Sequence, residues 1–377
     1  MMLILRSFNS TFLRGDIMGK NALEPLFDLF WDSGAIFFRW LFDGWIKPKT
    51  DFEPLWEETK LHNNSKTKPL LVNENNTDKT KTYIFSIPTG LTIKEFMSRK
   101  QALAQFLKED PRNIKIELVN NLATITIYDT SKLNFDYRSY SFDYDTKEIK
   151  IPIGISLKNF ETVCWHPTSP NECHMLIGGS TGAGKSVCLN VIMEYLINRN
   201  DVELYIQDTK VIDLVEYEEA SQTKIYNTGT DYATETVLGL VKEMNNRYDY
   251  LKARGLKNMS ECKAKDKPKT IFYIVEELAS YNPRDDKEYY SALAQILAKG
   301  RAAGVICVLT TQAPYSEILP GMLKNNINSI IGLKTRTKEA SKVIIGDYDL
   351  LVNLRGRGHG IFAVNGEYNE VQIFNMG

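Results

Sequence analysis

Residues 179–186 restrict the fold of this chain more than any other stretch of its sequence. They are Gly179, Ser180, Thr181, Gly182, Ala183, Gly184, Lys185 and Ser186, a full match to the phosphate-binding pattern G-x-x-x-x-G-K-[ST]. A short apolar run at 175–177 precedes them, and residues 185–197, with apolar positions at helical spacing, follow. This strand–loop–helix context is what gives the motif weight. We therefore predict a nucleotide-binding site in an α/β fold.

The residue types in this loop suit a bound triphosphate. The glycines allow successive backbone N–H groups to point at the phosphates, next to a helix N-terminus whose partial positive charge favours anions. Lys185 is expected to reach the β- and γ-phosphates, and the Ser186 hydroxyl is expected to ligate Mg²⁺. ATP and Mg²⁺ are therefore the predicted cofactors. The alternative is a glycine-rich turn in front of an ordinary helix.

Composition limits where a nucleic acid could bind. The 377-residue chain has 46 Lys and Arg residues against 47 Asp and Glu residues, so its formal net charge is −1. Any contact with nucleic acid must therefore use a local basic surface. The five cysteines form no C-x-x-C pair, and the apolar run at 2–5 is too short for a secretory signal. We expect a protein of the reducing cytoplasm.

The length allows two domains, or one large domain with an appendage. We predict a leader with an aromatic segment at 1–60, a polar linker at 61–81, a small α+β domain at 82–151 and an ATPase domain at 152–377. Within the small domain, the sequence pattern predicts strands at 82–87, 114–118 and 123–128 and a helix at 92–107.

The aromatic segment lies at 26–46. It holds Trp31, Trp40 and Trp45, three of the five tryptophans of the chain. On a helix its charged residues form one narrow stripe; they are Asp28, Asp32, Arg39 and Asp43. A charge-free run long enough to span a bilayer is missing. We predict docking on a membrane surface or a membrane-embedded partner; packing on the ATPase domain or on a sister subunit is the alternative.

Strands and helices alternate from about residue 157, which is typical of a parallel sheet with crossover helices. The predicted strands are 175–177, 202–207, 270–275, 304–310, 327–333, 360–364 and 371–374. The predicted helices are 185–197, 232–254, 288–298 and 339–345. This pattern predicts a RecA-like P-loop NTPase core.

Two acids follow the apolar strand at 270–275. The first, Glu276, is expected to hold the Mg²⁺ shell, and the second, Glu277, to polarise the attacking water. Gln312, at the end of the next strand, is expected to sense the γ-phosphate. The alternatives are two surface acids at a strand end and an amide that caps a turn. Asp208 also ends a strand, and a turn-capping role is favoured for it.

In these motifs residues 171–374 resemble the motor domain of the FtsK/SpoIIIE family of DNA translocases. The matching segments outside the two nucleotide motifs are 206–217, 243–248, 254–258, 301–304, 310–314, 319–326 and 354–358. The sequence departs from the family pattern in that Glu276 replaces an Asp and Thr209 replaces a Pro. It also ends at Gly377 without the winged-helix module of chromosomal members. This layout is most similar to the FtsK-like coupling ATPases of Gram-positive conjugative elements.

The resemblance implies a ring-forming motor, with a hexamer expected, that hydrolyses ATP to move plasmid or conjugative-element DNA toward a membrane channel. An arginine of the neighbouring subunit is expected to complete the nucleotide site, with Arg301 and Arg336 as candidates. DNA binding should be largely sequence-neutral. A translocase for plasmid or chromosome segregation, and an assembly adaptor that binds nucleotide without motor activity, are the alternatives.

A local charge bias supports contact with phosphates. Residues 299–360 contain nine Lys and Arg residues against four Asp and Glu residues. The basic residues are Lys299, Arg301, Lys324, Lys334, Arg336, Lys338, Lys342, Arg355 and Arg357. An ordinary solvated face is the alternative.

Overall fold

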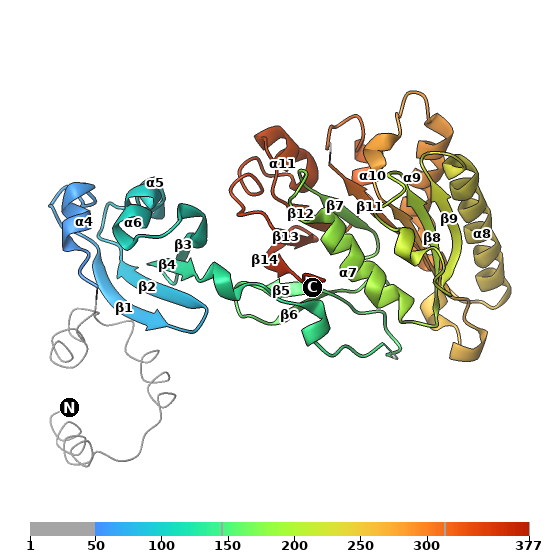
Figure 1. Ribbon diagram of the computed structural model, residues 1–377, viewed down its shortest axis with the longest axis horizontal. Helices are drawn as coiled ribbons and strands as arrows, with labels where there is room; N and C mark the ends of the chain where they lie inside the picture. The colour runs from blue at the N-terminus through green and yellow to red at the C-terminus, as the bar shows by residue number, and fades with distance from the viewer. Residues whose placement is uncertain (1–49, 145, 313, 377) are drawn as a thin grey trace, which may run out of the picture. The chain divides into compact units, whose positions relative to one another are not determined.

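The computed structural model of the chain describes residues 50–144, 146–312 and 314–376, and divides into two compact units (Figure 1). The first unit contains the described residues up to Asn75 together with Thr82–Ala102 and Ile116–Ile125. The second contains Asn76–Lys81, Leu103–Lys115 and the described residues from Thr126 onward. The aromatic segment at 26–46 lies outside the described residues. No helix in the described part of the chain is long and apolar enough to span a bilayer.

A four-stranded sheet in the order β1-β2-β4-β3 forms the N-terminal part of the described chain. Its elements are α4 (Glu53–Glu58), β1 (Leu70–Asn76), β2 (Thr80–Ser86), α5 (Ile93–Ser98), α6 (Lys100–Leu107), β3 (Ile114–Val119) and β4 (Leu122–Tyr128). Aromatic rings fill its core. Trp56 of α4 meets Phe85 of β2 edge to face, with ring centroids 5.3 Å apart, and Phe96 of α5 at 5.8 Å.

The structure places β1 inside the stretch 61–81 that we predicted as a linker. No residue of β1 is fully buried. An edge strand without a buried face needs no apolar alternation, so its polar sequence resembles a loop. The helix predicted at 92–107 is two helices, because Arg99 leaves the helical conformation between α5 and α6, with φ −103° and ψ 12°.

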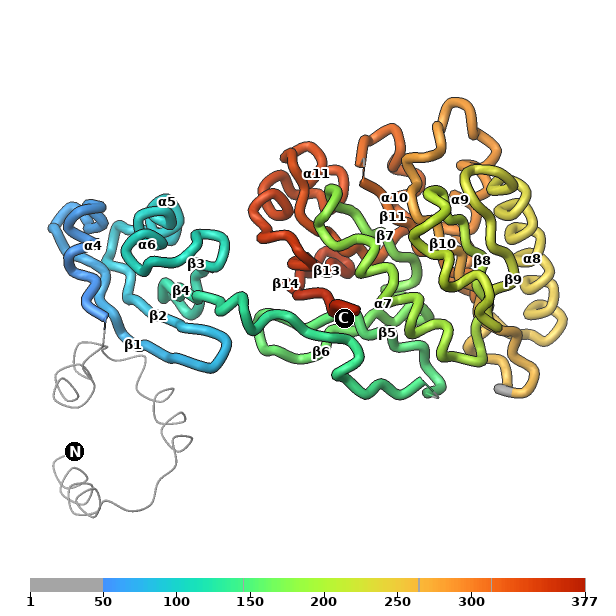
Figure 2. Tube along the Cα trace, viewed as in Figure 1, coloured from blue at the N-terminus to red at the C-terminus, as the bar shows by residue number. Residues whose placement is uncertain are grey.

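The second unit is built on a ten-stranded sheet in the order β6-β5-β14-β13-β12-β7-β11-β10-β8-β9. Its strands are β5 (Ile151–Ser156), β6 (Thr162–Trp165), β7 (Met175–Gly178), β8 (Val202–Asp208), β9 (Thr223–Thr228), β10 (Thr270–Val275), β11 (Val305–Thr311), β12 (Ser329–Leu333), β13 (His359–Val364) and β14 (Glu367–Ile373). In Figure 2 the red C-terminal segment returns beside the green β5, which pairs antiparallel with β14.

Six neighbouring strands of this sheet, from β12 to β9, are parallel. Their carboxyl ends therefore meet at one edge of the sheet, which is where ligands bind in open α/β sheets. Every residue of β10 and β11 is buried, as expected for central parallel strands covered on both faces. The predicted α/β fold with a parallel P-loop NTPase sheet is confirmed.

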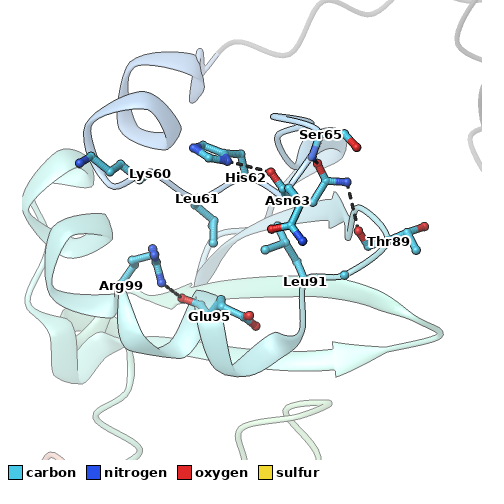
Figure 3. A pocket seen from close by; sticks show the side chains of 11 residues that line it. Lys60, Leu61, His62, Asn63, Ser65, Thr89, Leu91, Glu95 and Arg99 are labelled. Carbon is cyan, nitrogen blue, oxygen red and sulfur yellow. Dashed lines mark hydrogen bonds between the residues drawn. The ribbon is translucent and has the colours of Figure 1, made fainter.

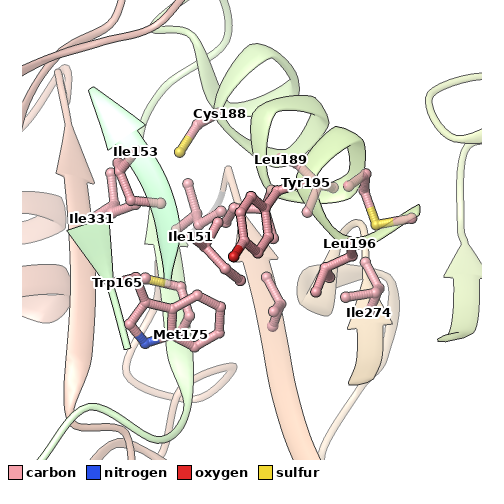
Figure 4. Close-up of a cluster of buried hydrophobic side chains, with 14 of the residues drawn as sticks. Ile151, Ile153, Trp165, Met175, Cys188, Leu189, Tyr195, Leu196, Ile274 and Ile331 are labelled. Carbon is pink, nitrogen blue, oxygen red and sulfur yellow. The ribbon is translucent and has the colours of Figure 1, made fainter. Parts of the chain in front are cut away.

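Helices cover both faces of the sheet (Figure 1). They are α7 (Lys185–Ile197), α8 (Ala233–Ala253), α9 (Lys287–Ala303), α10 (Gly321–Lys324) and α11 (Lys338–Ile345). Cys188, Leu189 and Leu196 of α7 pack on one face, in a cluster with Ile151 of β5 and Met175 of β7 (Figure 4). The helices α8 and α9 share a second cluster on the opposite face. The phosphate loop is thus anchored by a strand and a helix that are both buried.

Candidate functional site

The phosphate loop joins β7 to α7 and is held by the strands on either side of β7. The Gly179 N–H donates to the Thr311 carbonyl of β11 at 3.3 Å. The N–H and the hydroxyl of Ser180 both donate to the Lys334 carbonyl after β12, each at 2.9 Å. The loop is therefore positioned by three strands of the parallel sheet.

A second glycine-rich loop, residues 354–358, packs against the last glycine of the phosphate loop. The Gly358 N–H donates to the Ala183 carbonyl at 2.9 Å. A Cβ on Gly184 would lie 2.9 Å from the Gly358 nitrogen, and Gly184 has a φ of +112°. Sequence reasoning did not place this loop at the site, although its pattern, with glycines at 356 and 358, was visible.

The close approach of these two loops leads to a prediction. Gly182 is also left-handed, with φ +76°, but a Cβ there would meet nothing within 4 Å. Gly182→Ala should lower the free energy of unfolding by about 1 kcal/mol through backbone strain alone. Gly184→Ala should cost about 1–3 kcal/mol more, because its Cβ also displaces the backbone of the second loop. Denaturant unfolding of both variants without nucleotide tests this; equal losses would contradict the close packing.

Lys185 begins α7 and is only 7% exposed. Its Nζ donates to the Gly179 carbonyl at 3.0 Å, so the side chain lies back along the loop. Burial lowers the pKa of Lys185 to about 8, although the nearby carboxylate of Glu277 opposes this shift. The same ammonium also lies 3.5 Å from the Ser180 carbonyl, so its partners in the structure are carbonyl oxygens of the loop itself. A buried ammonium held in this way is well prepared to receive phosphate oxygens.

The lowered pKa of Lys185 makes ATP affinity depend on pH. Phosphates favour the charged amine, so the pKa of Lys185 is higher in the complex than its value of about 8 in the free protein. The affinity for ATP is then at its maximum below pH 8. It falls as pH rises toward the pKa of Lys185 in the complex, by up to about tenfold per pH unit. Titrations with a fluorescent ATP analogue between pH 7 and about 9.5 test this. Lys185→Met should bind more weakly and lose the pH dependence; a flat wild-type profile would contradict it.

Glu276 follows β10 and is buried at the carboxyl edge of the sheet. Its carboxylate forms an ion pair with the Lys210 ammonium and accepts the Thr209 hydroxyl at 2.7 Å. Burial raises the pKa of Glu276, and the hydrogen bonds from Lys210 and Thr209 oppose this shift. Thr209 thus provides a second contact to this carboxylate.

Glu277, Gln312 and Thr181 are joined by hydrogen bonds. The Gln312 backbone N–H donates to both oxygens of the Glu277 carboxylate, at 3.1 and 3.0 Å. The Thr181 hydroxyl donates to the Gln312 side-chain oxygen at 2.8 Å. Glu277 is 8% exposed. The structure therefore places the second acid, the amide and the phosphate loop in one connected group.

Asp213 is a further carboxylate beside the loop, and sequence reasoning missed it. The Ser186 hydroxyl donates to its Oδ2 at 3.5 Å, and the Lys210 ammonium lies 3.2 Å from the same oxygen. Asp208, in contrast, organises the turn after β8: its carboxylate accepts the N–H groups of Val211 and Leu214 at 2.9 and 3.1 Å.

The two candidate arginines lie at opposite edges of the sheet. Arg301 is in the last turn of α9, which leads into the start of β11, so it lies at the amino ends of the parallel strands. Arg336 follows β12 and lies two residues beyond Lys334, whose carbonyl holds the phosphate loop. Both arginine residues are exposed. Of these two arginines, only Arg336 shares an edge with the phosphate loop of its own chain.

Part of the basic bias at 299–360 serves the fold. Lys324 donates to the Val343 carbonyl near the end of α11. Lys338 pairs with Asp349 at 2.5 Å. Arg336 and Arg357 are exposed on the edge that carries the phosphate loop. The surface available for phosphate contact is thus smaller than the residue count suggests.

The first unit has a hollow of its own, of about 300 Å³ (Figure 3). Its rim is fixed by Asn63, which donates to the Thr89 carbonyl at 3.1 Å, and by Arg99, which donates to the Thr59 carbonyl at 3.1 Å. None of the site residues predicted from the sequence lines it.

Comparison with known proteins identifies relatives of this chain. Residues 132–362 match the model of the FtsK/SpoIIIE family. A protein of Staphylococcus aureus called DNA translocase FtsK is 32% identical over 216 residues, covering 53% of this chain and 27% of the relative. DNA translocase FtsK of Chlamydia trachomatis is 26% identical over 308 residues, covering 76% and 38%. The chain thus spans well under half the length of these relatives.

Two solved structures also match this chain. The pCW3 conjugation coupling protein TcpA, in its monomer form with ATPγS, matches with a TM-score of 0.61 at 21% identity, covering 86% of this chain and 94% of that chain. ATPases 2 and 3 of EssC from Geobacillus thermodenitrificans match with a TM-score of 0.54 at 17% identity, covering 65% and 47%. These likenesses concern the fold. Since the family match spans more than half of the residues, the chain belongs to the FtsK/SpoIIIE family.

Proposed function

We propose that this chain is an ATP-driven DNA translocase, and that it serves as a coupling ATPase for plasmid or conjugative-element DNA. The observation that carries this proposal is the hydrogen-bonded chain from Thr181 through Gln312 to Glu277. A motor must link the state of its phosphate site to other parts of the protein. Gln312 directly follows β11 and contacts both the phosphate loop and the second acid, so loss of the γ-phosphate would alter the position of the segment after β11.

The chemistry assigned to each residue follows from its position. ATP would bind residues 179–186, with the Lys185 ammonium on the β- and γ-phosphates. Ser186 and Glu276 offer a hydroxyl and a carboxylate, and such oxygens suit Mg²⁺, which would neutralise phosphate charge when bound. Glu277 would orient the attacking water and accept its proton. The backbone N–H of Gln312 fixes the orientation of that carboxylate.

The partners follow from the relatives. The relatives from Staphylococcus and Chlamydia are called DNA translocases, and TcpA is called a conjugation coupling protein. We infer that this chain acts on DNA as a homo-oligomer, as a hexameric ring, with largely sequence-neutral contacts to the backbone. Arg336 and Arg357, exposed at the sheet edge that carries the phosphate loop, support contacts with phosphate.

Localisation is proposed to be cytoplasmic with docking at a membrane or a membrane channel protein through residues 26–46. Trp rings favour the boundary between headgroups and acyl chains. Deletion of residues 1–49, which keeps α4 and its buried Trp56, followed by cell fractionation tests this. The truncated protein should move from the membrane fraction to the supernatant. A full-length protein already monodisperse without detergent would make the segment a packing element instead.

ATP turnover with double-stranded and single-stranded DNA tests the main proposal. A motor should be stimulated by one or both forms, and should displace a triplex-forming strand from a linear duplex only with hydrolysable ATP. A nucleotide-binding adaptor would bind ATP without DNA-stimulated turnover, which would refute the proposal. In cells that lack this protein, a coupling ATPase should be required for transfer of the conjugative element between cells. A segregation translocase should instead be required for retention of the plasmid or chromosome during growth.

A further inference from the structure

One ammonium group lies between two carboxylates beside the phosphate loop. Lys210 forms an ion pair with Glu276, and its Nζ is 3.2 Å from Asp213 Oδ2. The same Oδ2 accepts the Ser186 hydroxyl at 3.5 Å. A lysine side chain therefore carries the positive charge next to the serine and the glutamate that are proposed to hold Mg²⁺.

The donor set around this ammonium suits a small divalent cation. Mg²⁺ at nucleotide sites is held by one or two carboxylates, together with phosphate oxygens and waters. Among the described residues, no group of three or more His, Cys, Asp or Glu side chains could hold a metal ion, so nucleotide oxygens would have to complete the set. Glu276 and Asp213 are two carboxylates, and Ser186 adds a hydroxyl. A lysine ammonium and Mg²⁺ next to the same carboxylates repel each other, so each weakens the binding of the other.

The loop that carries Lys210 and Asp213 is strained and exposed. Val211 has a φ of +69°, which is unfavourable for a β-branched residue. Next to it, Ile212 is 72% exposed, and Val215 is 55% exposed. The exposed side chains of Ile212 and Val215 do not oppose a rearrangement of this loop, whose backbone is held by the hydrogen bonds from the Val211 and Leu214 N–H groups to Asp208.

We propose that Asp213 completes the Mg²⁺ shell with Ser186 and Glu276, and that Lys210 is a positioning residue that holds both carboxylates until Mg²⁺ and ATP displace it. This inference rests on the proposed function, since it concerns the same nucleotide site. The ammonium of Lys210 holds two neighbouring carboxylates close together in the free protein. It also makes binding of metal alone unfavourable, so that the metal enters with its nucleotide.

Metal binding without nucleotide tests the role of Lys210. The probe is Mn²⁺, whose free form is quantified by electron paramagnetic resonance, added to the full-length protein. Lys210→Met removes the charge while keeping the length of the side chain, and should tighten Mn²⁺ binding by at least about tenfold. The matched control is Lys224→Met, which removes a lysine from an ion pair with Glu203, 3.7 Å away, at the start of β9. It should leave Mn²⁺ affinity unchanged.

The role of Asp213 is tested in the same assay. Asp213→Asn in the Lys210→Met background should weaken Mn²⁺ binding by at least about tenfold, since one carboxylate is lost. Lys210→Gln, a milder change, repeats the test if Lys210→Met unfolds. Wild-type affinity in both lysine variants, or no effect of Asp213→Asn, would overturn the inference. These measurements use neither ATP nor DNA, so a failure of the proposed motor function would appear separately, as absent ATP turnover with an intact Mn²⁺ response.

Discussion

Glu277→Gln is expected to bind ATP with nearly wild-type affinity and to hydrolyse it at least about a hundredfold more slowly. General-base catalysis contributes about 10²–10⁴ in rate, and an amide is a poor acceptor for the proton of the attacking water. The carboxylate accepts the Gln312 N–H at 3.0 and 3.1 Å and the Ala279 N–H at 3.2 Å. The amide oxygen can keep part of these contacts, so the fold should survive. Single-turnover hydrolysis and binding of an ATP analogue measure the two effects.

Glu276→Gln is the matched control, because it makes the same chemical change one residue earlier. Its main effect should be a higher Mg²⁺ concentration for half-maximal turnover, since Glu276 faces Lys210 and Thr209 rather than Gln312. Normal turnover in Glu277→Gln, together with loss of turnover in Glu276→Gln at saturating Mg²⁺, would exchange the roles of the two acids.

The strands and helices at the centre of the second unit could be predicted because their apolar patterns are dictated by burial. The strand at 270–275 and the helix at 185–197 match β10 and α7 at both ends. The strands β5, β6 and β9 were not predicted. Strand β9 lies at the edge of the sheet and has only partly buried and exposed residues, so its sequence shows no regular alternation of apolar residues. The same reason explains β1 in the stretch taken as a linker.

The site residues that belong to a sequence motif could be predicted, because the motif specifies both the residue type and its position in the fold. The order of the parallel strands brings the ends of β7, β10 and β11 to one edge, which is why Lys185, Glu277 and Gln312 lie together. Asp213 and Lys210 could not be found this way. They lie on an irregular loop after β8, and only the three-dimensional path of that loop brings them to Ser186 and Glu276. The contact of residues 354–358 with the phosphate loop depends on the antiparallel return of β13 in the same manner.

The positions of Arg301 and Arg336 determine whether each arginine could act on the nucleotide of its own subunit or on that of a neighbouring subunit. Arg301 lies at the amino ends of the parallel strands, away from the phosphate loop of its own chain. Arg301 can therefore complete only the nucleotide site of a neighbouring subunit. Arg336 follows β12 at the same edge as the phosphate loop, so it can act on the nucleotide of its own chain. Loss of a trans-acting arginine should reduce turnover by about 10³ or more.

Mixing of inactive variants is expected to restore DNA-stimulated turnover for Arg301→Ala and not for Arg336→Ala. In a ring that contains Arg301→Ala and Lys185→Ala subunits, some interfaces combine an intact phosphate loop with an intact Arg301 from the Lys185→Ala neighbour. Arg336→Ala mixed with Lys185→Ala should stay inactive, because both changes damage the site of their own chain. Glu277→Gln mixed with Lys185→Ala is the control for two changes in one site, and it should also give no rescue. Rescue by Arg336→Ala alone would assign the trans-acting role to Arg336, after β12. Absence of rescue for both variants would argue against a nucleotide site shared between subunits.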